Sequence, residues 1–190
     1  MQREDLIVPL ISGQRVLDIG SLGQSSVYCL WNVLNEHSAS LTGVDLPDAE
    51  QTAREILKVT ADGLRHKNDP RITYGNMETL DLGATFDVVT AGDVIEHVSN
   101  QGLFLDNIRR HLMPGGRLIL TTPNAKWPTV LFRPNATHVL WHDAFTLRQL
   151  LERHGFRVET IRYYRGNKPH YPWWVRPLLL RQQIFVVARN

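Results

Sequence analysis

The sequence is poor in cysteine and lacks long apolar runs. Cys29 is its one cysteine, which excludes a framework of internal disulfides and fits a reducing compartment. No uninterrupted apolar run approaches the roughly 18 residues that a membrane-spanning helix needs. The first residues carry no apolar segment typical of a signal peptide. We therefore expect a soluble, cytoplasmic protein without a transmembrane segment.

Net charge is also low, because 21 basic residues stand against 19 acidic ones. Its distribution is uneven, since residues 148–190 carry nine basic and two acidic side chains. Basic residues interleaved with tyrosine and tryptophan, as in this segment, can bind nucleic acid, an anionic small molecule or a membrane surface. The excess is small for a nucleic-acid partner, so we expect a small-molecule partner.

The 190 residues are 43% hydrophobic, which predicts one compact domain over residues 1–190. Short β-branched or apolar runs alternate with amphipathic segments, a pattern typical of an α/β fold with a mainly parallel sheet. The expected strands are 15–19, 41–45, 71–74, 86–91, 117–122, 156–163 and 183–188. The expected helices are a short one within 1–14 and those at 25–35, 49–64, 103–112 and 146–154.

Two long connections interrupt this alternation. Residues 124–142 are rich in proline, asparagine, tryptophan and histidine, and residues 164–182 contain three prolines and a glycine. The second connection does not favour a helix, so the last two strands should be antiparallel. Long loops in compact domains are usually functional or mobile, and both are therefore candidate substrate loops.

The segment Val16–Ser26 predicts a ligand-binding turn. A strand that stops at Gly20 and then enters a helix lets the backbone approach a ligand closely, near free N–H groups. Asp45 follows Gly20 by 25 residues and ends the second strand. A carboxylate there can accept hydrogen bonds from both hydroxyls of a ribose. Separately each feature is also typical of an ordinary tight turn, but together they favour a nucleotide-like ligand.

Five segments resemble the successive motifs of class I S-adenosylmethionine-dependent methyltransferases. They are VLDIGSLGQS (16–25), GVD (43–45), GNMETLDL (75–82), FDVVTAGDVIEHV (86–98) and MPGGRLILTTPN (113–124). The similarity covers about residues 15–160 and is strongest to the group of ubiquinone-biosynthesis O-methyltransferases and of sugar and natural-product methyltransferases. It implies a three-layer Rossmann-like fold with a mostly parallel seven-stranded sheet, order 3-2-1-4-5-7-6, in which the seventh strand is antiparallel.

The resemblance also implies a cofactor and the residues that bind it. S-adenosylmethionine would donate a methyl group to an oxygen of a small metabolite, with nitrogen and carbon less favoured. The implied cofactor-binding residues are Asp18, Gly20, Ser21 and Gly23 at the methionine end, Asp45 at the ribose, Leu46, Asn76 and Met77 at the adenine, and Ala91, Gly92 and Asp93 after the fourth strand. The family's glycine pattern is altered here, because Leu22 and Gln24 stand where glycines are common.

Asp93, Glu96 and His97 would share one face if their segment is helical. His97 can then act as a general base, with His138 as a second candidate catalytic residue. Alternatively, Asp93, Glu96, His97 and His138 can bind a divalent metal. That pattern resembles metal-binding segments of some ubiquinone methyltransferases and of small-RNA 3′-terminal 2′-O-methyltransferases. A structural role is the third interpretation, and a metal is not the expected outcome.

The loop after the fifth strand gathers aromatic side chains and histidines that can form a substrate wall. We expect Trp141 to pack against the protein and His138 to face the cleft. Acceptor recognition would fall to this loop, to residues 164–182, or to a second subunit in a homodimer. Three alternatives stay open: a metal-dependent RNA 2′-O-methyltransferase, a nicotinamide-dependent oxidoreductase, and a non-catalytic module that binds an adenosyl ligand.

Overall fold

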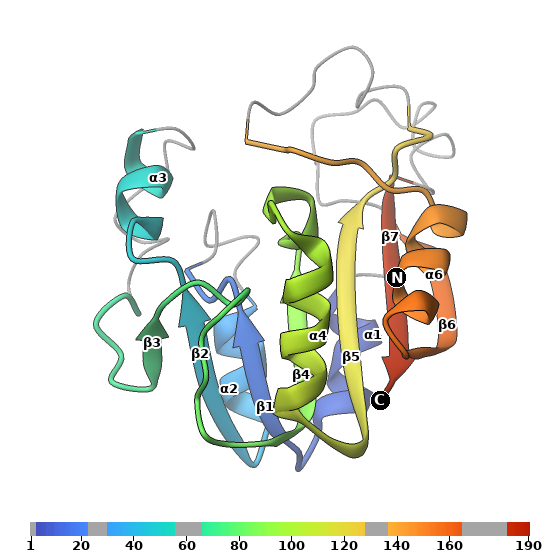
Figure 1. The fold of residues 1–190 in the computed structure, drawn as a ribbon. Coiled ribbons are helices and arrows are strands. Elements are labelled where there is room, and N and C mark those ends of the chain that lie inside the picture. Colours follow the sequence, from blue (N-terminus) through green and yellow to red (C-terminus); the bar gives the residue numbers. More distant parts are fainter. Residues whose placement is uncertain (1–2, 23–29, 56–65, 128–136, 165–181) are drawn as a thin grey trace, which may run out of the picture.

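The computed structural model of the chain describes residues 3–22, 30–55, 66–127, 137–164 and 182–190 (Figure 1). Its helices are α1 (Arg3–Ile11), α2 (Trp31–His37), α3 (Ala49–Glu55), the 3-10 helix η2 (Ile95–His97), α4 (Gln101–His111) and α6 (Ala144–Arg153). Its strands are β1 (Arg15–Ile19), β2 (Ser40–Asp45), β3 (Ile72–Tyr74), β4 (Phe86–Gly92), β5 (Leu112–Pro123), β6 (Arg157–Tyr164) and β7 (Gln183–Arg189). None of the helices in these ranges is long and apolar enough to cross a membrane.

The seven strands form one sheet in the order β3-β2-β1-β4-β5-β7-β6. The pairs β2–β3, β1–β2, β1–β4 and β4–β5 are parallel. Strand β7 runs antiparallel to both β5 and β6, and its arrow points the opposite way to that of β5 in Figure 1. The expected fold class, strand order and antiparallel seventh strand are confirmed.

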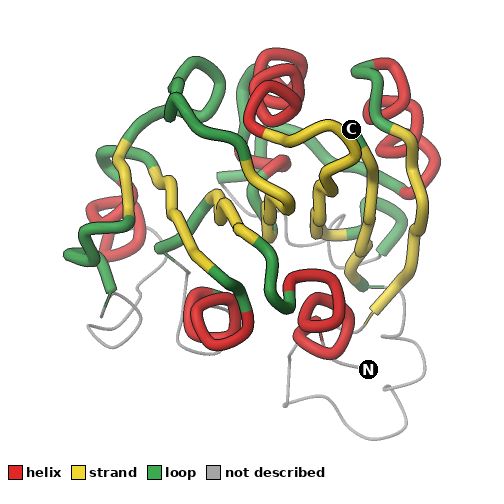
Figure 2. The backbone as a smooth tube through the Cα atoms, turned by 90° about the horizontal axis from the view of Figure 1, so that it is seen from below, coloured by secondary structure: helices red, strands yellow, loops and turns green. Residues whose placement is uncertain are grey.

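Helices cover both faces of the sheet, as the view from below shows (Figure 2). One core lies between the sheet and helices α4 and α6 and includes Phe104 of α4, Leu147 of α6 and Leu17 of β1. A second core packs α1 and α2, through residues such as Ile7 and Leu34, against the opposite face. Burial on both faces explains why the central strands read as nearly continuous apolar runs, and it produces the expected three layers.

The start of β5 differs from the sequence-based expectation. The sequence predicts a helix at 103–112 and a strand beginning at 117, but α4 ends at His111 and β5 already begins at Leu112. The pairing with β4 shifts between Phe86 and Val88, so an irregularity within the strand accommodates these residues. Gly115 adopts a φ of +76° there. The strand thus continues across a Pro-Gly-Gly sequence that usually stops a strand, with a local departure from the extended conformation at Gly115.

The expected helices 25–35 and 49–64 are only partly covered. Within the described residues α2 begins at Trp31, and α3 extends from Ala49 to Glu55. Residues 23–29 and 56–65 lie outside the described residues.

The carboxyl ends of β1, β2, β4 and β5 meet at one edge of the sheet, the upper edge in Figure 1. In open parallel sheets this edge is where ligands bind.

Candidate functional site

Gly20 ends β1 in a conformation that only glycine adopts readily. Its φ is +79°, and a Cβ atom built on it would lie 2.6 Å from Cγ2 of Val94. Its N–H donates to the Val44 carbonyl at 2.9 Å. The backbone therefore turns tightly between β2 and the segment after β4, as the motif predicted.

Asp45 holds the turn that follows Gly20. Its Oδ2 accepts from the backbone N–H of Leu22 at 2.7 Å, and its Oδ1 accepts from the N–H of Leu46 at 2.8 Å. Burial raises the pKa of the Asp45 carboxyl to about 6, although both N–H donors oppose this shift. Each carboxylate oxygen has a further lone pair, so Asp45 keeps the capacity to accept from a ligand diol.

Asp18 is buried one residue before the end of β1, with 3% of its surface exposed. Its Oδ1 accepts from the Thr90 hydroxyl of β4 at 2.6 Å. Burial raises the pKa of the Asp18 carboxyl to about 7, while the bond from Thr90 acts in the opposite direction. Ser21, also buried, donates its hydroxyl to the Asp18 carbonyl at 2.8 Å. Asp18 and Ser21 are therefore in direct contact, and Asp45 lies near enough for its charge to raise the pKa of Asp18 further.

Arg3 is a charged residue of this region that the sequence motifs did not reveal. It is only 7% exposed, and its guanidinium lies 3.4 Å from Oδ2 of Asp93. A Cβ atom built on Gly92 would lie 3.3 Å from Nη1 of Arg3. The first residue of α1 thus brings a buried cation to the end of β4, 90 residues away in the chain. Only a basic residue ahead of the first strand could have signalled it.

Asp93 departs from the geometry that the sequence suggested. Its φ of +56° places it in the left-handed region, and the 3-10 helix η2 begins only at Ile95. Its N–H donates to the Thr121 carbonyl at 3.0 Å, and its carboxylate accepts from the Thr121 hydroxyl at 3.2 Å. Asp93 therefore does not join Glu96 and His97 on a helical face. It is turned toward Arg3 and Thr121.

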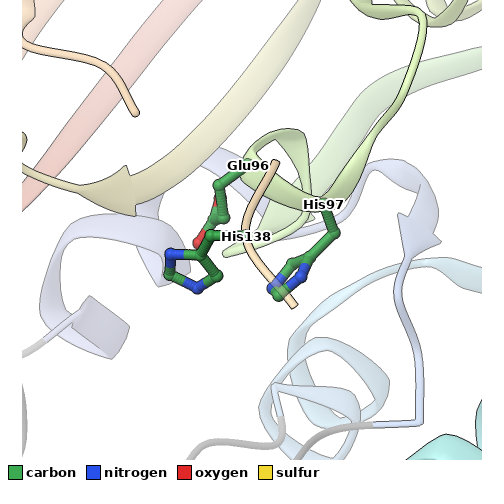
Figure 3. Close-up of side chains that lie close together, drawn as sticks. All are labelled: Glu96, His97 and His138. Carbon is green, nitrogen blue, oxygen red and sulfur yellow. The ribbon is translucent and has the colours of Figure 1, made fainter. Parts of the chain in front are cut away.

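Glu96, His97 and His138 come together instead (Figure 3). One ligand atom from each lies within 4.8 Å of the others, and the two imidazole rings meet edge to face at 4.7 Å between centroids. The carbonyl of Glu96 accepts from the N–H of Val139 at 2.9 Å, which holds the segment carrying His138 against η2. The structure thus brings together three of the four candidate metal ligands and both candidate catalytic residues.

Two buried atoms of this cluster have no hydrogen-bond partner among the described residues, namely Glu96 Oε1 and His138 Nδ1. The other carboxylate oxygen of Glu96 accepts from the Thr122 hydroxyl at 2.9 Å. His97 Nδ1 lies 3.0 Å from the carbonyl oxygen of Thr137. Because a carbonyl only accepts, Nδ1 carries the proton and Nε2 of neutral His97 keeps its lone pair.

Burial controls the charge of the cluster. It raises the pKa of the Glu96 carboxyl well above its usual range, and the nearby charge of Asp93 adds to this effect. It lowers the pKa of the His97 imidazole, and it lowers the pKa of His138 to about 4. At neutral pH both imidazoles are therefore neutral and available as acceptors or ligands.

The remaining predicted cofactor residues have varied surroundings. Leu46 is 47% exposed, whereas Met77 and Ala91 are buried within the core that packs against α4. Asn76 lies after β3 and accepts with Oδ1 from the N–H of Glu78 at 2.8 Å. Gly23 lies outside the described residues.

The loop after β5 is described only in part, because residues 128–136, which include the predicted loop residue Phe132, lie outside the described residues. The prediction that Trp141 packs against the protein is wrong, because 41% of it is exposed. His142 is the buried member of this pair and lies 2.9 Å, through Nε2, from Nε2 of Gln101. Backbone pairing next to His142 fixes this position, since the His142 carbonyl accepts from Ala125 N–H at 2.7 Å.

Comparison with known proteins identifies the family. The family model described as a methyltransferase domain matches residues 4–161. The chain belongs to this methyltransferase family. Solved structures described as S-adenosylmethionine-dependent methyltransferases match nearly the whole chain in fold. Membership of a methyltransferase family decides against the nicotinamide-dependent alternative.

The curated relatives include ubiquinone biosynthesis O-methyltransferases. That of Nitrobacter winogradskyi is 32% identical over 155 residues, covering 76% of this chain and 55% of the relative. The mitochondrial enzyme of Rattus norvegicus is 32% identical over 174 residues, covering 80% of this chain and 46% of the relative. The chain thus spans about half the length of these curated relatives.

The solved structures agree in fold. An S-adenosylmethionine-dependent methyltransferase from Archaeoglobus fulgidus matches with a TM-score of 0.69 at 17% identity, covering 99% of this chain and 91% of that one. The N-methyltransferase NodS from Bradyrhizobium japonicum, in complex with S-adenosyl-L-homocysteine, matches with a TM-score of 0.63 at 18% identity, covering 99% and 85%.

Proposed function

We propose that this methyltransferase transfers the methyl group to an oxygen of a small-molecule acceptor. One observation carries the proposal: Glu96 and His97, directly after β4, meet His138 from the loop after β5 at the same sheet edge as Gly20 and Asp45. An alcohol or phenol loses a proton when it is methylated, and this cluster offers groups that can accept one. The curated relatives, which are named as O-methyltransferases, also favour oxygen.

In this proposal the cofactor lies along the edge formed by β1, β2 and β4. Asp45 accepts from the ribose hydroxyls beside exposed Leu46, while Gly20–Leu22 borders the methionine portion. Buried Arg3 would pair with its carboxylate, and the Asp18 carboxyl, once ionised beside the ammonium group, would accept hydrogen bonds from that ammonium. When bound, S-adenosylmethionine supplies the methyl group as a sulfonium electrophile, so the protein's main task is to position the acceptor.

His97 is the proposed proton acceptor. The hydrogen bond between His97 Nδ1 and the Thr137 carbonyl fixes the ring and directs proton uptake to Nε2. Neighbouring His138 meets the ring of His97 edge to face and restricts its rotation. The exposed apolar side chains of Val139, Leu140 and Trp141 follow His138 directly and would contact an aromatic or apolar acceptor.

A methyl-transfer assay with labelled cofactor tests this proposal. We expect methylation of catechol or phenol acceptors and less of matched amines. His97→Ala should lower kcat by about 10²-fold or more and leave the Kd for S-adenosylhomocysteine nearly unchanged. With 4-nitrocatechol, whose hydroxyl ionises near neutral pH, the defect should shrink because no base is needed. Methylation of amines alone, or an undiminished kcat in His97→Ala, would contradict the proposal.

The same cluster fits a divalent metal. Two observations support the fit: a carboxylate and two imidazoles converge, and two of their buried polar atoms, Glu96 Oε1 and His138 Nδ1, lack a partner among the described residues. Glu96, His97 and His138 would hold the ion, while Asp93 is engaged by Arg3 and Thr121. A bound cation would gather and acidify acceptor oxygens. Imidazole donors favour Mn²⁺ or Zn²⁺ over Mg²⁺.

Calorimetric titration of the chelator-treated protein tests this second proposal without an activity measurement. We expect Mn²⁺ and Zn²⁺ to bind more tightly than Mg²⁺, and Glu96→Gln and His138→Ala to weaken binding by at least about tenfold. Asp93→Asn is the matched control and should retain the metal, because an asparagine tolerates the left-handed backbone. If Asp93→Asn loses the metal as fully as Glu96→Gln does, this ligand set is wrong.

A further inference from the structure

In the turn Gly20–Leu22 after β1, two side chains hold one peptide group from opposite sides. The Ser21 carbonyl oxygen lies 2.7 Å from His66 Nε2, and the Leu22 N–H donates to Asp45 Oδ2 at 2.7 Å. The C=O and N–H of a trans peptide point in opposite directions. His66 and Asp45 therefore fix the rotation of the Ser21–Leu22 peptide together. Rotating it would turn the carbonyl oxygen toward the Asp45 carboxylate.

His66 must be the donor in this contact, because a carbonyl oxygen only accepts. Its Nε2 therefore carries a proton in the bound arrangement. The ring is stacked on buried Trp31 with 5.4 Å between centroids and an interplanar angle of 6°. The guanidinium of Arg71 lies 5.3 Å from the centroid of the Trp31 ring, so Trp31 is itself held in place. The imidazole plane is thus set by packing, independently of its hydrogen bond.

The backbone that carries His66 is also fastened. The His66 carbonyl accepts from the N–H of Asp69 at 2.9 Å, and the Lys67 carbonyl accepts from the Tyr74 hydroxyl. Lys67 forms an ion pair with Glu50 of α3 at 2.6 Å. The residues around position 66 are therefore tied to α3 and β3, the elements that flank Asp45.

We propose that His66 is a positioning residue for the cofactor, which holds the Ser21–Leu22 peptide in its binding orientation. The Leu22 side chain is buried in the core on the side of α1 and α2. The turn is thus held by this buried side chain and by a side-chain donor from the connection before β3. The inference rests on the proposed position of the methionine portion beside Gly20–Leu22, and not on the identity of the acceptor.

Two variants separate the hydrogen bond from the stacking. His66→Phe keeps an aromatic ring on Trp31 but removes the donor, whereas His66→Gln places an amide N–H near the position of Nε2. By calorimetry we expect His66→Phe to weaken binding of S-adenosylhomocysteine by about tenfold, the loss of one well-placed hydrogen bond. His66→Gln should stay within about threefold of the wild type. Adenosine, which lacks the methionine portion, should bind both variants as it binds the wild type.

The outcomes distinguish this inference from the cofactor placement on which it rests. Equal affinity of the wild type for S-adenosylhomocysteine and adenosine would refute the proposed methionine site itself. Unchanged S-adenosylhomocysteine binding in His66→Phe would refute the role of His66. Equal losses in both variants, accompanied by matching decreases in melting temperature or in adenosine affinity, would make His66 a structural residue only.

Discussion

At the scale of single residues, the carboxyl of Asp18 is buried beside Thr90 and accepts a hydrogen bond from the Thr90 hydroxyl. Burial raises its pKa to about 7. An unfolded chain exposes this group to water, where its pKa is near 3.9. The folded state therefore retains a proton on Asp18 over a pH range in which the unfolded state has already lost it.

This difference predicts a pH-dependent stability. The contribution of Asp18 is fully present below about pH 4 and is lost as the pH rises toward the folded pKa of about 7. Between pH 5 and pH 8 the wild type should lose up to about 3 kcal/mol from this group, a loss that Asp18→Asn avoids. Urea unfolding of both proteins at the two pH values measures the difference.

Asp81→Asn serves as the control, because the Asp81 side chain is 88% exposed. It should follow the wild type at both pH values. If Asp18→Asn also follows the wild type, the proton on Asp18 does not govern the stability of this region.

At the scale of elements, helix α6 begins immediately after the segment that carries the site residues. Asp143 is its N-cap and accepts from the Thr146 N–H at 2.8 Å, and the Asp143 N–H lies 3.1 Å from the Thr146 hydroxyl, which completes a capping box. The Lys126 ammonium, 2.8 Å from Asp143, lowers the pKa of this carboxyl to about 2 as the largest of several causes. The ion pair between Lys126 and Asp143 thus also connects the start of the loop after β5 to its end.

Removing the cap should destabilise the helix. We expect Asp143→Ala to lower the free energy of unfolding by about 1 kcal/mol, since the Thr146 N–H in the first turn of α6 loses its side-chain acceptor. Asp143→Asn should retain most of the stability, because asparagine caps helices well but does not attract Lys126. Thermal unfolding of the three proteins provides the comparison, and equal stability of Asp143→Ala and the wild type would contradict it.

At the scale of the whole molecule, most of the fold but less of the candidate site could be predicted from the sequence. Strand positions followed from apolar runs buried on both faces, such as that around Val88 and Val89, and the strand order from the resemblance. Gly20 was predictable because a tight turn after a strand requires its φ. Contacts between distant segments were not: Arg3 reaches Asp93 only because α1 packs behind the sheet.

Local geometry caused the other differences. The shared face of Asp93, Glu96 and His97 required a helical segment after β4, but the 3-10 helix η2 begins only at Ile95 and Asp93 is turned away from Glu96 and His97. Periodicity does not foresee this, because it assumes regular helical spacing. His66 belongs to no sequence motif, and its contact with Ser21 becomes visible only in the folded structure.

The position of β7 between β5 and β6 also has a kinetic consequence. Both neighbours precede β7 in the chain, so a growing polypeptide produces β5 and β6 before the strand that joins them. Until residues 183–189 leave the ribosome, β5 exposes an unpaired edge and β6 has no place in the sheet. Closing the sheet then depends on pairings between distant segments, which form slowly. We expect translation of β7 to be the step that makes the nascent domain resistant to aggregation and proteolysis.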